Sequence, residues 1–279
     1  MNILVTGING FLGSFLALSL RQKHQLIGIS RVSEVANKIS IYNSGNLSEI
    51  QINPDIIIIC HAAISSGNTQ PDTATLFNDN VLFTEKITTQ FPKAKYIYIS
   101  SASIYNTNDY SVSELSFSKP ANNYAMSKYW GELIIQRSLA CAIIRLSSLY
   151  GIGMKENTLI PNYVNQAICK GIIEVWGAGI RNQNYFHVDD AVELVNAVIL
   201  NDQWSKEMYL GTDISEYSNL QIAEIIAAET NAKIVFKNTD LSASINFDNK
   251  VTRDSLNWKP ATTISKGLKQ YIEWKKRQF

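Results

Sequence analysis

The chain has 279 residues, of which 46% are hydrophobic, and it is almost neutral, with 25 Lys and Arg against 24 Asp and Glu. A chain of this length can bury a large core in one α/β domain that carries a smaller second lobe. No block of like charge is present to form a continuous basic surface, so nucleic acid is not expected as a partner. The apolar runs are far shorter than the roughly 20 residues of a membrane helix, so no membrane association is expected.

The cysteines and the start of the chain bear on where the protein works. Cys60, Cys141 and Cys169 are scattered and fit no metal-ligand spacing, so no metal site is predicted. The first predicted strand begins at Asn2, which leaves no room for a signal peptide. A cytoplasmic location is therefore expected.

The first half of the chain alternates short β-branched runs with longer helical patterns, which is typical of βαβ units and a parallel sheet. The runs are apolar at nearly every position, as expected for strands that helices cover on both faces. The pattern predicts an α/β fold of the Rossmann type, with a doubly wound parallel sheet. The predicted strands are residues 2–6, 25–31, 55–61, 95–100 and 142–146, and the predicted helices are 11–23, 74–91 and 123–138.

After Gly151 the rhythm becomes irregular, and no linker rich in Gly, Pro or Ser separates the parts. Three tryptophans in this half, Trp176, Trp258 and Trp274, lie at apolar positions and are predicted to be core residues. The predicted elements are helices at 160–170, 188–200, 220–230, 250–256 and 264–275 and strands at 172–176 and 233–237. We expect residues 1–150 to form a dinucleotide-binding Rossmann domain to which 182–210 return, and 151–181 and 211–279 to form a small C-terminal α/β substrate lobe.

A glycine-rich loop joins the first predicted strand to the first predicted helix. Gly7 allows a tight turn, Gly10 lets the backbone approach a pyrophosphate, and Gly13 lets the helix pack closely on its strand. The phosphates are expected over the free amides at the helix N-terminus. The predicted cofactor contacts in this loop are Gly7, Asn9, Gly10, Phe11, Leu12 and Gly13.

The end of the second predicted strand indicates which dinucleotide binds, because an acidic residue there favours NAD and an arginine favours NADP. Here the strand ends in Ser30 and Arg31, and the first carboxylate is Glu34. Arg31 can form charge-assisted bonds to a 2′-phosphate, helped by the hydroxyl of Ser30 or Ser33. NADP is therefore the predicted cofactor. NAD remains possible, and so does a role for Arg31 as a solvated surface residue.

Tyr124 and Lys128 lie four residues apart and share one face of a predicted helix. The ordinary pKa of a tyrosine hydroxyl is about 10, so a tyrosine can act as an acid or base near neutral pH only if positive charge lies beside it. Lys128 and an oxidised nicotinamide can supply that charge, and a serine after the strand at 95–100 can polarise a substrate carbonyl. Most such pairs on a helix have no function, but this one follows a glycine loop and a serine-rich strand end. We therefore predict that it is the catalytic centre.

These motifs together resemble the extended short-chain dehydrogenase/reductases of the NAD-dependent epimerase/dehydratase family, which modify nucleotide sugars. The likeness runs through the glycine loop, His61-Ala62-Ala63, Asn80-Val81, Ser101 to Tyr105, Tyr124 to Lys128, Arg145 to Gly151, Phe186 to Asp190 and Leu256 to Pro260. The resemblance implies that the catalytic serine is Ser101, four residues before Tyr105, rather than Ser100. It also implies cofactor contacts from His61, Ala62, Ala63, Asn80 and Lys128, and substrate contacts from Ser103, Thr158 and Arg181.

The resemblance further implies a nucleotide-sugar substrate and a homodimer. Arg181 is the candidate for binding the diphosphate, since a guanidinium can bind two phosphate oxygens at once. The helical patterns at 74–91 and 123–138 resemble those that pair into a four-helix bundle in dimers of the family.

Differences from the sequence patterns of related enzymes narrow the set of reactions that the chain is expected to catalyse. The 4,6-dehydratases carry an Asp-Glu pair where this chain has Ala102 and Ser103, and GDP-fucose synthase has a cysteine and a histidine where Ser103 and Thr158 stand. The remaining chemistry needs one hydride and one proton, so we predict NADPH-dependent reduction of a nucleoside-diphosphate 4-keto-6-deoxy sugar. A UDP-hexose-type 4-epimerase with tightly held NAD is the alternative. A non-catalytic protein that senses dinucleotides is a lesser one.

Overall fold

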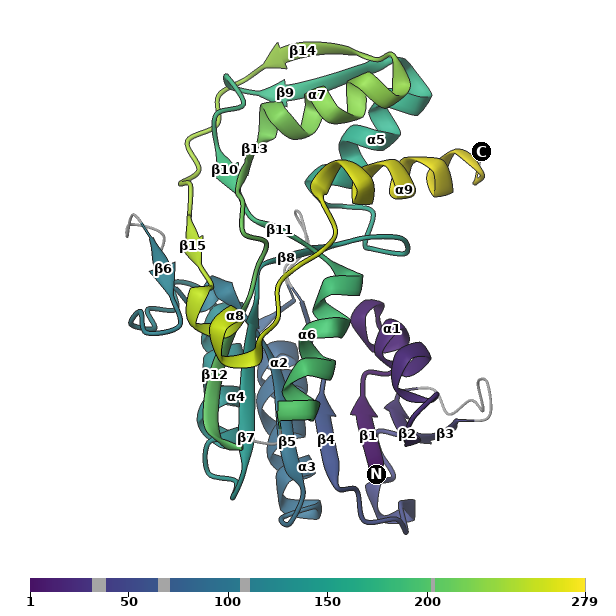
Figure 1. The fold of residues 1–279 in the computed structure, drawn as a ribbon, viewed down its shortest axis with the longest axis vertical. Helices are drawn as coiled ribbons and strands as arrows, with labels where there is room; N and C mark the ends of the chain where they lie inside the picture. The colour runs from purple at the N-terminus through teal and green to yellow at the C-terminus, as the bar shows by residue number, and fades with distance from the viewer. Residues whose placement is uncertain (32–38, 65–70, 106–110, 202–203, 279) are drawn as a thin grey trace.

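The computed structural model describes residues 1–31, 39–64, 71–105, 111–201 and 204–278 (Figure 1). Its centre is a seven-stranded sheet in the order β12-β7-β5-β4-β1-β2-β3, and every pair of neighbouring strands is parallel. The strands are β1 (Asn2–Thr6), β2 (Gln25–Ser30), β3 (Ser40–Asn43), β4 (Ile56–Ile59), β5 (Lys95–Ser101), β7 (Cys141–Leu146) and β12 (Ser205–Gly211). The chain starts in the middle of the sheet and winds outward in both directions, which confirms the predicted doubly wound Rossmann fold.

The sequence pattern predicts the five inner strands but misses β3 and β12 at the two edges of the sheet. β3 has only four residues, and β12 carries Glu207 beside an irregularity in its pairing with β7. Edge strands pair on one side only and are often short or charged, so they lack the continuous apolar run of an inner strand.

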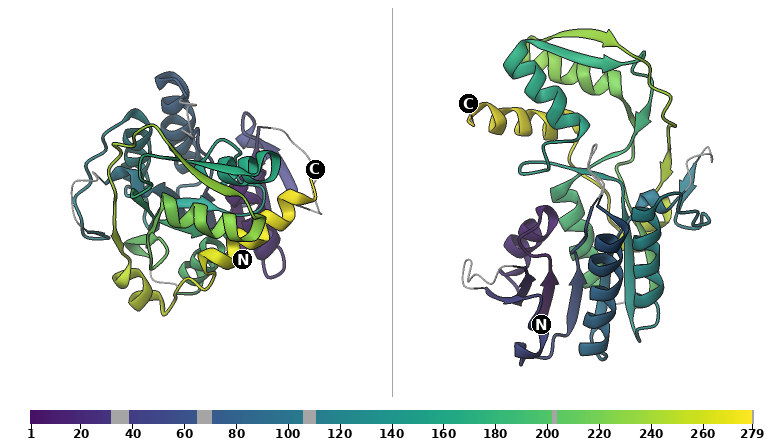
Figure 2. Two further views of the ribbon diagram at one scale, coloured as in Figure 1. Left: turned by 90° about the horizontal axis from the view of Figure 1, so that it is seen from above. Right: turned by 180° about the vertical axis from the view of Figure 1, so that it is seen from behind.

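Helices cover both faces of the sheet, as the views in Figure 2 show. The helices α1 (Phe11–Leu20) and α6 (Val188–Asn201) pack on one face, and α3 (Phe83–Gln90) and α4 (Asn123–Ile135) pack on the other. Successive residues of β1 alternate between the two cores: Ile3 and Val5 face α1 and α6, and Leu4 faces α3 and α4. This alternation explains why the inner strands are apolar at every position.

The predicted helix at 74–91 is continuous but contains a change of helix type. It consists of α2 (Thr73–Leu76), a π-helical segment η2 (Phe77–Leu82) and α3. The side chain of Asp72 caps its start by accepting a hydrogen bond of 2.7 Å from the Thr75 amide. The π-helical segment contains Asn80, and such segments often occur at functional sites.

A second hydrophobic core forms above the carboxyl ends of the strands. It consists of α5 (Leu159–Lys170), α7 (Asn219–Thr230) and α9 (Ile264–Lys276) on a parallel pair of strands, β9 (Ile172–Trp176) and β14 (Lys233–Lys237). The prediction that Trp176 is a core residue is wrong, because its side chain is 56% exposed. Helices cover only one face of β9, so Ile173 and Val175 are buried and Trp176 faces the solvent. Trp258 and Trp274 pack against the two cores.

Further pairs of short strands lie outside the large sheet, and one buried carboxylate joins α6 to the segment before α9. The paired strands are β8 (Ser148–Tyr150) with β11 (Tyr185–His187), β10 (Asn182–Gln183) with β13 (Tyr217–Ser218), and β6 (Val112–Ser113) with β15 (Phe247–Asp248). Asp190, in the first turn of α6, accepts hydrogen bonds of 2.9 and 3.0 Å from the amides of Ala261 and Thr262. This carboxylate therefore holds the segment that leads into α9.

The remaining helical elements are α8 (Lys250–Leu256), η1 (Leu47–Glu49) and η3 (Ala102–Ile104). α8 contacts β12 and α6, so this part of the predicted lobe segment 211–279 lies against the large sheet. The predicted domain boundaries remain a prediction. Among the described helices, none combines the length and apolar character needed to cross a bilayer.

Candidate active site

The glycine loop brings β1, α1 and the end of β4 into close contact. Gly7 has φ +66°, and a Cβ there would lie 2.8 Å from the Cα of His61. A Cβ on Gly13 would overlap the carbonyl oxygen of Gly7, so only glycine permits this approach of helix and strand. Gly10 stands at the N-cap of α1, and no side chain caps this helix. The site therefore fits a dinucleotide pyrophosphate, for which the helix N-terminus offers backbone amides.

The side chains of the other predicted cofactor contacts in this loop differ in how exposed they are. Asn9 is exposed and its Nδ2 donates a 3.2 Å hydrogen bond to the hydroxyl of Ser30. Phe11 is half-buried and packs against both hydrophobic cores. The side chain of Leu12 is buried in the sheet core, so only its backbone can contact a dinucleotide.

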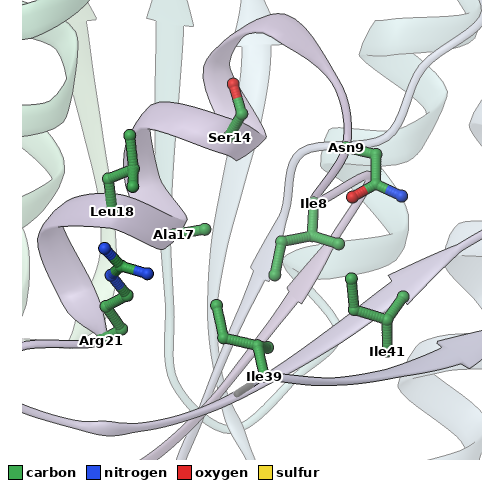
Figure 3. Close-up of a pocket in the computed structure, with 8 residues that line it drawn as sticks. All are labelled: Ile8, Asn9, Ser14, Ala17, Leu18, Arg21, Ile39 and Ile41. Carbon is green, nitrogen blue, oxygen red and sulfur yellow. The ribbon is translucent and has the colours of Figure 1, made fainter. Parts of the chain in front are cut away.

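A cavity of about 170 Å³ opens beside the glycine loop, between α1 and β3 (Figure 3). The residues that line it are Ile8, Asn9, Ser14, Ala17, Leu18, Arg21, Ile39 and Ile41. Arg21 adds a guanidinium that sequence reasoning did not identify, because no motif marks the end of α1. Arg31 is exposed just after β2, and its carbonyl oxygen accepts a 2.8 Å hydrogen bond from Asn43. Ser33 and Glu34 lie outside the described residues.

The loop after β4 is tied to β1 by His61. Its Nδ1 lies 2.7 Å from the hydroxyl oxygen of Thr6, and its Nε2 lies 3.4 Å from that of Thr84. Burial, and then the charge of Lys128, lower the pKa of His61 to about 3. His61 is therefore neutral near pH 7 and orders this loop.

Asn80 ties the same loop to α4. Its Oδ1 accepts a 2.7 Å hydrogen bond from the Ala63 amide, and its Nδ2 donates to the carbonyl of Ala63 at 3.0 Å and to the hydroxyl of Ser127 at 2.9 Å. Ser127 in turn donates to the carbonyl of Tyr124. Ala62 and Ala63 are half-buried beside this contact. Both N–H donors of the Asn80 amide are therefore used within the protein, and its contribution to cofactor binding stays a prediction.

Tyr124 and Ser101 come together where α4 begins and β5 ends. The N-cap Asn122 starts α4 by accepting a 2.8 Å hydrogen bond from the Ala125 amide, which places Tyr124 in the first turn. Burial raises the pKa of Tyr124, and the nearby side chain of Ser101 opposes that effect. The hydroxyl of Ser101 also lies 2.9 Å from that of Ser103. A row of three hydroxyls therefore stands at the carboxyl edge of the sheet.

Lys128 lies one turn further along α4 and is only 2% exposed. Its Nζ is 4.2 Å from the centroid of the Tyr98 ring, in a cation–π contact. Burial lowers the pKa of Lys128 to about 8, while Cys60 and Glu132 act in the opposite direction. Lys128 thus holds a buried ammonium one turn along α4 from Tyr124.

The predicted substrate contacts fall into two groups. Ser103 is exposed in η3, beside Ser101. Thr158 stands at the N-cap of α5, and Arg181 precedes β10, with its Nε 3.4 Å from the carbonyl oxygen of Ala243. Both of these residues belong to the segment above the sheet. The structure thus brings Ser103 to the hydroxyl row and places Thr158 and Arg181 on the opposite lobe.

Sequence reasoning also missed a buried ion pair behind the site. Arg145 on β7 and Glu132 on α4 are 3% and 1% exposed, and they pair at 2.6 Å. In the sequence, this pair is indicated by an acidic residue, Glu132, one helical turn beyond Lys128. A lone charge on a helix is usually solvated, so the sequence alone does not distinguish this case.

Replacing Lys128 should stabilise the fold. Its pKa is about 8 in the folded chain against an ordinary value of 10.5, so the unfolded chain binds more protons between these pH values and stability rises with pH across them. We expect Lys128→Met to raise the free energy of unfolding by about 2 to 3 kcal/mol at pH 7. Denaturant unfolding at pH 7 and pH 10 measures this. A gain that does not shrink at the higher pH would contradict a charge penalty at this site.

Comparison with known proteins supports the family assignment. The chain is 24% identical to protein CapI of Staphylococcus aureus, over 98% of both chains. It is 25% identical to a dTDP-D-glucose 4,6-dehydratase of Dictyostelium discoideum, with 80% of this chain covered but only 61% of that protein. It is also 25% identical to the GDP-6-deoxy-D-talose 4-dehydrogenase of Aggregatibacter actinomycetemcomitans, over 86% of this chain and 84% of that protein.

Solved structures have the same fold along the whole chain. MoeE5 in complex with UDP-glucuronic acid and NAD superposes with a TM-score of 0.88 at 20% identity, over 100% of both chains. UDP-glucuronic acid 4-epimerase from Bacillus cereus, in complex with UDP-glucuronic acid and NAD, gives 0.88 at 19% identity, again over 100% of both chains. The profile of the NAD dependent epimerase/dehydratase family matches residues 3–210, so the predicted resemblance is confirmed and the chain belongs to this family of enzymes.

Proposed function

We propose that the chain transfers a hydride at C4 of a nucleoside-diphosphate sugar, and that its reaction is the NADPH-dependent reduction of a 4-keto-6-deoxy sugar. The observation that carries this proposal is the proximity of the Tyr124 and Ser101 side chains, close enough for the serine to oppose the burial effect on the tyrosine pKa, with the buried ammonium of Lys128 one turn further along the same helix. This arrangement can bind a carbonyl oxygen and deliver one proton to it.

Each residue has a distinct task in the proposed reaction. The hydroxyl of Ser101 donates a hydrogen bond to the substrate carbonyl, and Tyr124 gives its proton to the same oxygen as the carbonyl carbon is reduced. Lys128 stabilises the tyrosinate that remains and binds the nicotinamide ribose. A dinucleotide on the glycine loop supplies the hydride. Ser103 contacts the sugar, while Thr158 and Arg181 contact the substrate from the lobe, Arg181 at the diphosphate.

The segment after Ser101 argues against dehydration, although several relatives are named dehydratases. Dehydration needs an acid for the leaving hydroxyl and a base for the neighbouring proton. Residues 102 and 103 are Ala and Ser. Ala102 is 4% exposed and belongs to a small apolar cluster with Tyr105 and Val112, so this turn offers neither group.

A 4-epimerase is the second candidate, and the solved structures that hold NAD with a UDP-sugar favour it. An epimerase uses the same tyrosine, serine and lysine, but the hydride leaves the sugar and returns to its other face within one turnover. The two reactions therefore differ in whether dinucleotide is consumed. A sensing protein would bind dinucleotide and change no sugar.

Turnover should consume NADPH and depend on the Tyr124 hydroxyl. We expect absorbance at 340 nm to fall stoichiometrically when the protein is mixed with NADPH and dTDP-, GDP- or CDP-4-keto-6-deoxyglucose. Tyr124→Phe should lower kcat by at least about 100-fold, because it removes the proton donor. Dinucleotide affinity should stay near the wild-type value.

The other outcomes of that assay separate the alternatives. Constant absorbance, with NAD bound to the purified protein and UDP-sugars interconverted at C4, would replace the reductase with the epimerase. NADPH binding without change in any nucleotide sugar would favour the sensing protein.

We further propose that Arg31 selects NADP, because this basic residue is exposed and directly follows Ser30 at the end of β2. Arg31→Ala should raise the KM for NADPH about tenfold or more through loss of charge-assisted bonds to the 2′-phosphate. The KM for NADH in the same variant is the internal control and should hardly change. An equal rise for both dinucleotides would remove Arg31 from phosphate recognition.

We also propose that the chain forms a homodimer through η2 and α4. These elements expose an apolar face of Phe77, Leu82, Met126, Trp130 and Leu133, each 39–50% exposed. Phe77 and Trp130 meet edge to face with ring centroids 5.6 Å apart. The α4 members recur at helical spacing on one stripe, which fits an interface between antiparallel helices.

Introducing a charge into this face should separate the protomers. We expect Trp130→Glu to shift the chain from dimer to monomer in light scattering coupled to gel filtration, because an unpaired carboxylate would have to be buried. Trp176→Glu is the matched control, since Trp176 is similarly exposed but lies on β9 of the lobe. A dimer that persists in the Trp130 variant, or is lost in both, would refute this interface.

A further inference from the structure

The buried pair behind the hydroxyl row is held in a fixed geometry. Arg145 Nε donates to Oε1 of Glu132 at 2.9 Å, and Nη2 donates to Oε2 at 2.6 Å. Ser100 donates a third hydrogen bond, of 2.6 Å, to Oε1 of the same carboxylate. Planar bidentate contacts of this kind set orientation as well as distance.

This one carboxylate joins three elements of the site. Glu132 lies on α4 one turn beyond Lys128, Ser100 immediately precedes Ser101 on β5, and Arg145 is on the neighbouring strand β7. The α4 helix carries Tyr124 and Lys128, and the end of β5 carries their partner Ser101. The contacts of Glu132 therefore determine how the helix and the strand end lie relative to each other.

Arg145 also contacts the segment that follows β5. Its Nη2 donates a 2.7 Å hydrogen bond to Ser118, and its guanidinium lies 4.7 Å from the centroid of the Tyr105 ring. The segment that follows Ser101 and Ser103 thus packs on the same guanidinium.

Such a pair is a weak means of stabilising a fold, because the cost of desolvating both charges can exceed their attraction. The fixed geometry of the pair is, by contrast, well suited to aligning α4 with the end of β5. We propose that Glu132 is a positioning residue of the reaction, holding Tyr124 and Lys128 on α4 in register with Ser101 at the end of β5. This inference rests on the proposed hydride transfer at these residues.

The charge of Glu132 also reaches Lys128. The groups that face Lys128 are Cys60 and His61 after β4, Tyr98 on β5 and Glu132 on α4, with Arg145 on β7 beyond Glu132. Burial lowers the pKa of Lys128, and Cys60 and then Glu132 raise it. Loss of the Glu132 charge therefore lowers this pKa further, so the ammonium is lost at a lower pH.

Glu132→Gln tests the role because it keeps the shape of the side chain and removes its charge. We expect kcat to fall by about tenfold or more, with KM changed far less, because misalignment affects the reacting groups rather than substrate binding. The alkaline limb of the pH–rate profile should move to lower pH. Glu85→Gln, which breaks the exposed Glu85–Arg137 pair, is the matched control and should keep the wild-type kcat and profile.

Two further variants separate positioning from folding. Ser100→Ala leaves the ion pair intact and removes only its link to β5, so we expect a lower kcat at an unchanged midpoint of thermal unfolding. Glu132→Gln combined with Arg145→Met removes both charges, and its midpoint should recover relative to either single variant while kcat stays low. Recovery of kcat together with the midpoint, or a wild-type kcat and profile in Glu132→Gln, would overturn the proposal.

A binding measurement distinguishes failure of this inference from failure of the proposed function. Fluorescence titration measures NADPH affinity without any sugar substrate. Because Lys128 is proposed to bind the ribose through its ammonium, the affinity should depend on the protonation of Lys128. In Glu132→Gln the loss of NADPH affinity with rising pH should begin at a lower pH than in the wild type. If the wild type binds NADPH but reduces no sugar, the reductase proposal fails, and this titration still decides whether Glu132 controls Lys128. An unchanged titration would refute that control.

Discussion

The close packing of α4 on β5 is the constraint on which the site depends. A Cβ on Gly131 would overlap the hydroxyl of Tyr98, so glycine at this position lets the helix lie directly on the strand. The same approach places Lys128 over the Tyr98 ring and Glu132 within hydrogen-bonding distance of Ser100. A tyrosine at the start of the helix and a serine at the end of the strand can then share a hydrogen bond. A shift of the helix would separate all of these contacts together.

The parallel sheet explains why residues far apart in the sequence meet at one edge. The glycine loop follows β1, His61 follows β4, and Ser101 ends β5, and the carboxyl ends of parallel strands lie on the same side. The second core stands above this edge, and Thr158 at the N-cap of its helix α5 and Arg181 just before β10 belong to the same lobe. A ligand that spans the strand ends and the lobe would contact both, which fits a molecule with a nucleotide at one end and a reacting sugar at the other.

The sequence could predict those parts of the structure that local rules determine. The inner strands were recognisable because alternate residues enter two different cores, and Tyr124 with Lys128 was recognisable because four residues make one helical turn. The strands β3 and β12 were missed because edge strands do not need a continuous apolar run. The π-helical segment around Asn80 has no distinct signal in an otherwise ordinary helical pattern. Trp176 was misjudged because a two-stranded sheet buries one face only.

The Glu132–Arg145 pair shows most clearly what local reasoning cannot supply. The two residues belong to different elements, and each alone would be read as a surface charge. Only the packing of α4 against β5 and β7 shows that both are buried and that Ser100 completes the contact. Burial disfavours the charged forms of both His61 and Lys128, but the outcomes differ. It keeps His61 neutral and makes the ammonium of Lys128 costly, while the paired charges of Glu132 and Arg145 compensate each other. Lys128 therefore carries its positive charge at a cost, and the proposed reaction would use that charge at a tyrosinate and at a dinucleotide ribose.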